Sequence, residues 1–255
     1  MNFEEIDKRM RPYEQSLDQR ILPEIYMAAR IDGRSFSRLT REICHFDAPY
    51  DVRFKEMMVK TVEALMDCGF RVVYGYTQSD EISLLFHPDE TAFGRKTRKY
   101  NSILAGQASA VFSVQLGQPA VFDCRMIPLP TKERVQDYFM WRQEDAHRNA
   151  MNGHAYWLLR SEAMDADQAT QYLKGKSVSD KNELLFSRGI NFDKLPSWQK
   201  RGIGVYWSVT EKQGLNPLTG EKTVTQRRIL KCDEEIPFGM EYAEFIGGFL
   251  TDNVY

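Results

Sequence analysis

Hydrophobic residues recur along the first half of the chain with two different periods. Short apolar runs rich in β-branched and aromatic residues are typical of buried strands, whereas apolar residues spaced three and four apart are typical of helices. Glycine, proline or aspartate stands at nearly every boundary between the two patterns. This alternation predicts strands over 24–33, 70–77, 81–86 and 119–130, and helices over 49–68 and 93–116.

The predicted elements of the first half follow the order strand, helix, strand, strand, helix, strand. This is the order of the split βαβ, or ferredoxin-like, arrangement, whose first and third strands lie side by side in an antiparallel sheet. The first helix is expected to have Asp47 as its cap and Gly69 as its stop. We therefore predict an α+β fold with a ferredoxin-like βαββαβ core over residues 1–130.

The second half of the chain is predicted to be mostly helical, with a terminal β-hairpin. Asp180 and Glu183 are expected to form a capping box at one helix start. Because no flexible linker divides the chain, we expect residues 131–255 to pack on the core as one structural unit. The predicted elements are one long or two broken helices over 131–159, helices over 166–174 and 180–188, strands over 202–212 and 222–231, and a turn over 216–222.

Composition argues against several classes of protein. The 255 residues are 42% hydrophobic and 27% charged, which is ordinary for a globular protein, and the net charge of −2 does not indicate a polyanion partner. No stretch approaches the roughly 18 apolar residues of a membrane span, and the polar N-terminus is not a signal peptide, so a cytoplasmic protein is expected. The scattered cysteines predict reduced thiols rather than a zinc site or disulfides. They are Cys44, Cys68, Cys124 and Cys232.

Two aspartates interrupt the apolar pattern at the ends of predicted strands. Asp32 ends the first strand, and Asp80 lies in the bend between the second and third strands. In the predicted topology these positions meet on one rim of the sheet, while strand alternation turns Glu81 away from Asp80. Mg²⁺ is usually bound through one or two carboxylates plus substrate phosphates, so a two-ion site is one interpretation. The other is that both aspartates are ordinary turn residues.

Three further segments could bind a nucleotide. Gly33 permits close backbone approach, and successive amides over 32–37 could cradle a triphosphate. The basic residues at 95–99 open a long helix, where the helix dipole also favours anions, although a solvated basic face is the alternative. Lys181 and Asn182 open another short helix, which alone would pass as an ordinary capped start.

Four ordered motifs resemble those of the tRNA-histidine guanylyltransferase family. Residues 30–36, 75–81, 138–143 and 180–186 read RIDGRSF, GYTQSDE, YFMWRQ and DKNELLF. The resemblance extends from Leu22 to Trp207, most of the chain. It implies a core like the palm of nucleic-acid polymerases, and an enzyme that adds nucleotides to the 5′ end of tRNA in the 3′-to-5′ direction.

The resemblance also implies roles for individual residues. Asp32 and Asp80 would be catalytic and would hold two Mg²⁺ ions, with the carbonyl of Gly33 as a further ligand. ATP and GTP or other NTPs would be substrates, tRNA would be the partner, and a homotetramer is the expected assembly. The implied nucleotide-binding residues are Asp32, Gly33, Arg34, Ser35, Phe36, Ser37, Ser79, Asp80, Arg95, Lys96, Lys99, Lys181 and Asn182.

The sequence departs from the family at one motif. The branch that adds guanosine to tRNA-histidine carries His-Ile-Asn-Asn where this chain has His147, Arg148, Asn149 and Ala150. His147 and Asn149 are still candidate tRNA contacts. The departure favours the guanylyltransferase-like branch, which repairs truncated tRNA 5′ ends against a template, over a strict tRNA-histidine guanylyltransferase.

Two other functions stay open on the sequence alone. A nucleotidyl or diguanylate cyclase uses a palm with carboxylates at the same two places, but the bend here reads QSDE rather than a GGDEF-like loop, and cyclases lack the downstream motifs. A non-catalytic RNA-binding module of the RRM type shares the βαββαβ order. The segment RVVYGYT lacks its pattern of stacking aromatics, however, and such a module has no use for Asp32 and Asp80.

Overall fold

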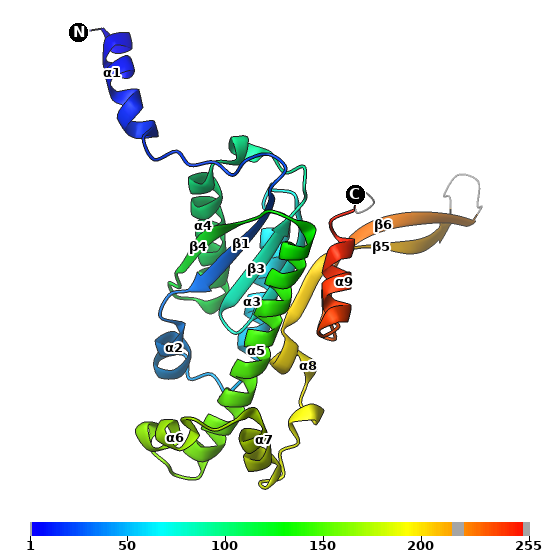
Figure 1. The fold of residues 1–255 in the computed structure, drawn as a ribbon. Helices are drawn as coiled ribbons and strands as arrows, with labels where there is room; N and C mark the ends of the chain where they lie inside the picture. Colours follow the sequence, from blue (N-terminus) through cyan, green and yellow to red (C-terminus); the bar gives the residue numbers. More distant parts are fainter. Residues whose placement is uncertain (1, 216–221, 252–255) are drawn as a thin grey trace.

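The computed structural model describes residues 2–215 and 222–251. Its strands are β1 (Tyr26–Gly33), β2 (Val72–Gln78), β3 (Glu81–Phe86), β4 (Phe122–Leu129), β5 (Ile203–Leu215) and β6 (Lys222–Asp233). They form one antiparallel sheet in the order β4-β1-β3-β2-β5-β6 (Figure 1). The α+β prediction, with the first and third strands as neighbours, is confirmed. The two late strands extend the same sheet, and most of the predicted turn between them lies outside the described residues.

The two predicted helices of the first half are present with different starts. Helix α3 (Val52–Met66) is capped by Asp51, whose carboxylate accepts hydrogen bonds from the amides of Arg53 at 2.7 Å and Phe54 at 3.4 Å. Asp47 was therefore the wrong cap; its own amide donates to Asp51 at 2.8 Å. Helix α4 (Thr97–Leu116) begins later than predicted, after the 3-10 turn η2 (Ala92–Arg95).

In the second half, α5 (Lys132–Ser161) is one continuous helix. Helix α7 (Val178–Phe186) begins with a capping box of Ser177 and Asp180, so the predicted pair of Asp180 and Glu183 was wrong by one turn. Ser177 is the N-cap because its extended backbone lets the hydroxyl reach the amide of Asp180 at 3.1 Å. The other elements are α1 (Phe3–Gln15), α2 (Phe36–Arg38), η1 (Leu39–Ile43), α6 (Ala166–Leu173), η3 (Phe192–Lys194), α8 (Ser197–Arg201) and α9 (Met240–Gly248).

Helices cover the two faces of the sheet unequally. Successive strand residues point to opposite faces, so Ala29 and Ile31 of β1 are buried against α3 and α4, whereas Ala28 belongs to the core under α5 and α9. Helix α9 packs beside α5 over the β2 and β5 part of the sheet, where Tyr74 is fully buried. The β4 and β1 part of that same face lies on the other side of α5 (Figure 1).

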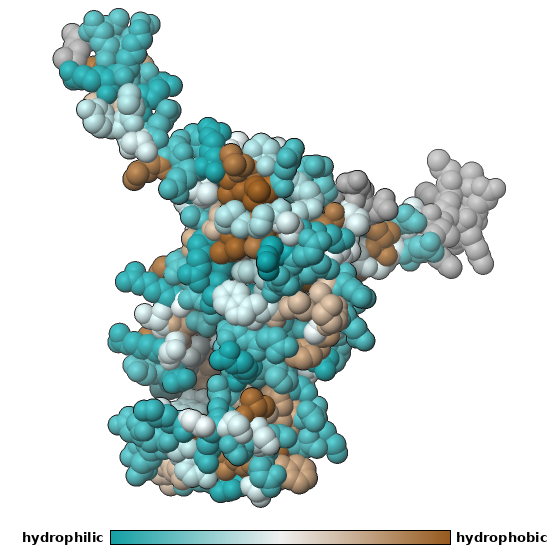
Figure 2. Space-filling model, viewed as in Figure 1, coloured by the Kyte–Doolittle hydropathy of each residue, from teal (hydrophilic) through white to brown (hydrophobic). Residues whose placement is uncertain are grey.

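The N-terminal helix α1 projects from the body and has no buried residue (Figure 1). Figure 2 shows that the visible face of the protein is mostly hydrophilic, with small apolar patches. Among the described residues, no helix combines the length and the apolar character that a membrane crossing requires.

Candidate functional site

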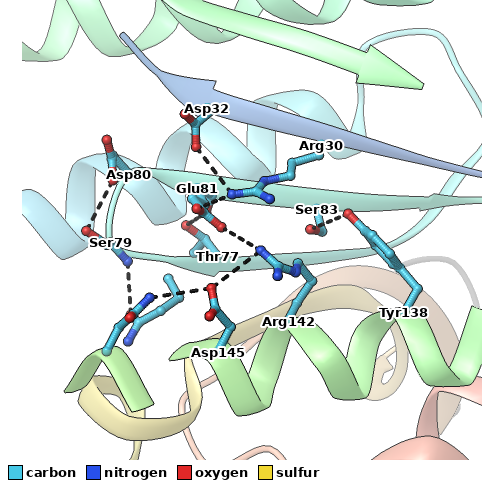
Figure 3. A network of polar contacts seen from close by, with 12 residues as sticks. Arg30, Asp32, Thr77, Ser79, Asp80, Glu81, Ser83, Tyr138, Arg142 and Asp145 are labelled. Atoms are coloured by element: carbon cyan, nitrogen blue, oxygen red, sulfur yellow. Dashed lines mark hydrogen bonds and ion pairs between the residues drawn. The ribbon is translucent and has the colours of Figure 1, made fainter. Parts of the chain in front are cut away.

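The end of β1 and the β2–β3 bend meet on one rim of the sheet. The amide of Gly33 donates a hydrogen bond to the carbonyl oxygen of Asp80 at 3.1 Å, and Asp32 is the register partner of Glu81. Ser79, with a φ of 53°, adopts the left-handed conformation that closes the bend. Two segments far apart in sequence are thus joined, and the carboxylates of Asp32 and Asp80 lie on the same rim (Figure 3).

The carboxyl of Asp80 is in an unfavourable place for a negative charge. Burial, followed by the nearby charge of Asp32, raises the pKa of Asp80 to about 6. The hydroxyl of Ser79 donates to this carboxylate at 3.2 Å, which stabilises the charge only partly. An aspartate pair of this kind is suited to a cation that neutralises both members.

Glu81 faces a network of arginines that extends to α5 (Figure 3). Arg30 of β1 pairs with Glu81 and lies 3.7 Å from Asp32. Arg142 of α5 lies 3.3 Å from Glu81 and 3.6 Å from Asp145, and its side chain is 4% exposed. The network ties α5 to the rim that carries the two aspartates. Sequence reasoning assigned no role to Arg30, Arg142 or Asp145; the available signal was that two of them lie within the RIDGRSF and YFMWRQ motifs.

The oxygen donors at the rim fit a hard divalent cation. No group of three or more His, Cys, Asp or Glu side chains suited to a metal occurs within residues 2–215 and 222–251. A cation between Asp32 and Asp80 would therefore complete its shell with backbone, water or substrate oxygens, as Mg²⁺ commonly does. Burial raises the pKa of Asp80 and so disfavours its ionised form. A bound cation would offset this effect, because it favours the ionised carboxylate.

The segment after Gly33 could hold phosphates through only part of its backbone. The amides of Gly33 and Arg34 are engaged by Asp80 and by the carbonyl of Val121, at 3.1 and 2.8 Å, so the amides that could face a phosphate begin at Ser35. The ring of Phe36 is 2% exposed and packs in the core, which leaves only its backbone for a ligand. Arg34 and Ser37 are exposed.

Two cavities meet at the bend. One, of about 150 Å³, extends from Ser79 and Asp80 to aromatic residues that include Tyr50, Trp157 and Trp198. The other, of about 300 Å³, has the same Ser79 and Asp80 at one side and polar residues of α5 at the other, among them Arg142, Asp145 and Asn149. Two ligands could therefore approach Asp80 from different sides.

The predicted basic cluster lies at the opposite end of the sheet from Asp80. Strand β3 leads away from the bend, so α4 starts at the far edge. Arg95 is buried and its guanidinium donates to the carbonyl of Ile25. Lys96 pairs with Asp18 at 2.6 Å, and Lys99 lies over the ring of Phe93. Within one chain these basic residues do not join the aspartate pair.

The remaining predicted binding residues lie in different places, and only some of them line a cavity. Asn149 lines the polar cavity beside Asp80, but the ring of His147 lies between Phe192 and Phe238, each 5.3 Å away, and burial lowers its pKa. Lys181 lines an open groove of about 610 Å³, together with Arg41 and Trp157. Asn182 is exposed on α7.

Comparisons with known proteins point in one direction. The sequence matches the model of the family described as "tRNAHis guanylyltransferase" over residues 7–130, and that described as "Thg1 C terminal domain" over residues 133–237. It is 32% identical over 246 residues to a "Probable tRNA(His) guanylyltransferase" of Drosophila melanogaster, covering 91% of this chain and 82% of that one. The fold matches a bacterial tRNA(His) guanylyltransferase (Thg1)-like protein in complex with GTP, with a TM-score of 0.75, 27% identity and coverage of 96% of this chain and 98% of that one. The match to its complex with ATP has the same TM-score of 0.75 and 27% identity, and covers 96% and 99%.

Proposed function

The chain belongs to the tRNA(His) guanylyltransferase family and is a nucleotidyltransferase, and we propose that it adds nucleotides to the 5′ end of tRNA in the 3′-to-5′ direction. The observation that carries the proposal is the meeting of Asp32 and Asp80 on one rim, joined by the Gly33 to Asp80 hydrogen bond of 3.1 Å. Relatives of this fold in complex with GTP and with ATP support nucleoside triphosphates as substrates.

The proposed reaction has two chemical steps. The 5′-phosphate of the RNA attacks the α-phosphorus of ATP, the bond to the β-phosphate breaks, and pyrophosphate leaves. The 3′-hydroxyl of the incoming NTP then attacks the 5′-phosphorus, loses its proton and displaces AMP. An RNA that already carries a 5′-triphosphate skips the first step and releases pyrophosphate. The product in each case has one more nucleotide, joined through a new phosphodiester.

The protein's contribution is mainly to position the reactants and to neutralise charge. Asp32 and Asp80, with the carbonyl of Gly33, would hold two Mg²⁺ ions. When bound, the ions would lower the pKa of the attacking hydroxyl and offset charge on the leaving group. The amides of Ser35, Phe36 and Ser37 and the side chains of Arg34, Ser37 and Ser79 would bind the triphosphate, and the aromatic cavity would receive the base.

Predicted binding residues that lie farther from the aspartate pair would make additional contacts. Lys181 would contact the nucleotide or the RNA from the groove beside Trp157, and Asn149 would do so from the polar cavity. Asn182 would do so from the exposed surface of α7. Arg95, Lys96 and Lys99 would bind a triphosphate or the tRNA away from the aspartate pair of their own chain. A homotetramer would bring such a cluster toward a neighbouring chain's site, and sedimentation of the full chain tests that assembly.

We further propose template-dependent repair of truncated 5′ ends rather than strict addition of guanosine to tRNA-histidine. The support is the departure at Arg148 and Ala150 from the His-Ile-Asn-Asn motif. Under this proposal, pairing with the opposite strand of the acceptor stem selects the incoming NTP. The strict tRNA-histidine activity is the alternative.

The deciding experiment supplies each labelled NTP with a tRNA that lacks its first nucleotide, with and without Mg²⁺. We expect incorporation of the NTP that pairs with the exposed template base, and none after chelation. An intact tRNA-histidine and an RNA with an unpaired 5′ overhang are run in parallel. Guanosine addition to tRNA-histidine alone would support the strict activity, and equal extension of paired and unpaired ends would rule out templating.

A further inference from the structure

One part of the sheet face that carries Asp32 is left open beside α5. Arg30 and Asp32 alternate with core residues along β1 and face the α5 side, and Arg125 of β4 is the register partner of Arg30. Arg125 and Asp123 are exposed, because α9 lies on the other flank of α5 (Figure 1). The open face therefore includes Asp123 and Arg125 of β4, and it borders the partly buried Arg30 and Asp32 of β1.

An exposed tryptophan borders this open face. Trp141 is 57% exposed, although it lies on α5 beside buried residues. Gln136 and Gln143 of the same helix donate to the carbonyls of Ala243 in α9 and of Pro237 just before it. Trp141 therefore lies on the flank of α5 that faces away from α9. The indole is thus directed to the side of α5 on which Asp123 and Arg125 of β4 are exposed.

The orientation of Trp141 is fixed by contacts with Arg142 and Tyr138 of the same helix. The guanidinium of Arg142 lies 3.6 Å from the centre of the indole ring, and the ring of Tyr138 lies 6.3 Å away at an angle of 64°. Arg142 is itself held by Glu81 at 3.3 Å and Asp145 at 3.6 Å. A flat aromatic surface backed by a fixed arginine is pre-organised, and it loses little side-chain entropy when a ligand stacks on it.

The open face carries charges of both signs: Asp123 is the register partner of Asp32 and lies at the aspartate end, whereas Arg125 is the residue on this face that could pair with an anionic group. Arg30 and Arg125 are directly opposite one another on neighbouring strands, an arrangement of like charges that is unfavourable without a compensating anion. Glu81 compensates Arg30, and Arg125 stands nearer the edge, exposed to solvent. Nucleic acid combines the two chemistries found here, because its bases stack on aromatic rings and its phosphates pair with arginine.

We propose that Trp141 stacks against the terminal base pair of the RNA substrate and that Arg125 contacts a phosphate next to it. The proposal rests on the proposed function, which supplies an RNA end at Asp32 and Asp80. Stacking of a planar pair on Trp141 would place the 5′-phosphate toward the aspartates along the same face. It would also favour a paired end over a frayed one, because a base pair offers a larger stacking surface.

A thermodynamic cycle tests the stacking directly. The RNA is an acceptor-stem hairpin with a 3′-fluorophore, carrying either a normal or an abasic 5′-terminal nucleotide, and its Kd is measured by fluorescence anisotropy with Mg²⁺ and without NTP. Loss of the base should weaken binding to the unchanged protein about tenfold, within the range known for base–aromatic stacking. Trp141→Ala should weaken binding of the normal hairpin by a similar factor. It should show no further loss with the abasic one, because the two changes remove the same contact.

Companion variants separate stacking from general effects. Trp141→Phe should lose about threefold, because a smaller ring still stacks. Arg125→Gln should weaken both hairpins alike and reduce the slope of log affinity against log salt by about one. The control is Phe3→Ala, which removes an aromatic residue of 77% exposure from α1, a helix with no buried residue, and should leave both affinities unchanged.

The outcomes distinguish this inference from the proposed function. If losses from the abasic nucleotide and from Trp141→Ala simply add, Trp141 does not contact that base and the inference is wrong. If Trp141→Ala changes the sedimentation coefficient of the protein but not its RNA affinity, the open face is a contact with a second copy of the chain. That result also overturns the inference. If the cycle shows coupling but no NTP is incorporated, the proposed function fails while the stacking stands.

Discussion

The amide of Gly33 donates to the carbonyl oxygen of Asp80, and this 3.1 Å hydrogen bond fixes the end of β1 against the β2–β3 bend. The two residues are distant in sequence, yet their backbones continue the pairing of β1 with β3 by one more contact. The carboxylates of Asp32 and Asp80 are consequently positioned by backbone geometry rather than by flexible side chains. A rigid pair of this kind can bind ions without a large ordering cost.

Replacing either aspartate should remove activity without unfolding the protein. We expect Asp32→Asn and Asp80→Asn each to lower labelled-nucleotide incorporation by about a thousandfold or more, because charge neutralisation at the phosphates is lost. Asp89→Asn, at an exposed position beyond the end of β3, is the control and should be active. Near-normal incorporation by either variant would end the assignment of that carboxylate.

Asp80→Asn should also stabilise the protein, but only at pH values at which the carboxyl of Asp80 is ionised in the unchanged protein. Because burial and Asp32 raise the pKa of Asp80 to about 6, the folded state binds this proton more tightly than the unfolded chain does. The associated stability is present at low pH and is lost as the pH rises through the folded pKa. We expect Asp80→Asn to gain on the order of 1–2 kcal/mol at about pH 7.5, and much less at about pH 4, in urea denaturation without Mg²⁺. An equal gain at both pH values would show that charge is not its cause.

Metal affinity should follow the ionisation of Asp80. Above the pKa of about 6 the carboxylate that binds a cation predominates, and below it the proton competes. We expect the affinity for Mn²⁺, used as a spectroscopic probe without nucleotide, to fall about tenfold for each pH unit below about 6. Binding measured by electron paramagnetic resonance should weaken far less steeply for Asp80→Asn, whose remaining affinity comes from other oxygens. A flat profile for the unchanged protein would contradict the assignment of Asp80 as a ligand.

The sequence was sufficient to predict the order of the first four strands and the meeting of Asp32 and Asp80, but not that β5 would pair with β2. Both follow from local periodicity and from the βαββαβ connection, which determines which strand ends share a rim. The far position of Arg95, Lys96 and Lys99 could also have been predicted, because a helix that follows β3 must begin at the edge opposite the bend. The short distance along the sequence between these residues and Asp80 does not make them neighbours in space.

Other features depend on packing that periodicity does not encode. The contact between Arg142 and Glu81 exists because α5 lies across the sheet, and no local pattern specifies that placement. The choice between Asp47 and Asp51 as the cap of α3 was ambiguous, since both precede the helix; the structure shows Asp51 close enough to reach two amides. Helix α9 is only nine residues long and was not predicted.

Glu81→Gln should destabilise the fold more than it alters the reaction. The change leaves the nearly buried Arg142 with Asp145 as its remaining ion-pair partner among the described residues, and it leaves Arg30 with Asp32. We expect a loss of about 2 kcal/mol in the free energy of unfolding, less than for a fully buried pair because Glu81 is partly exposed. Asp137→Asn is the control, because it breaks an exposed pair with Arg134 on α5 and should cost about 0.5 kcal/mol or less. Equal losses in the two variants would show that the network contributes no special stability.

Gly33 is constrained by the ring of Phe36, and a methyl group there should disturb both the core and the site. A Cβ at Gly33 would lie 2.5 Å from the ring of Phe36, which is itself buried in the core. Since the ring cannot move away freely, Gly33→Ala should cost roughly 1–3 kcal/mol by overpacking and should shift Asp32 relative to Asp80. We expect GTP affinity, measured by titration calorimetry with Mg²⁺, to fall at least tenfold. The matched control is Gly106→Ala in α4, where a Cβ would meet nothing within 4 Å and should add about 0.5–1 kcal/mol of stability. If Gly33→Ala were as stable and as active as Gly106→Ala, close packing at Gly33 would have no part in shaping the site.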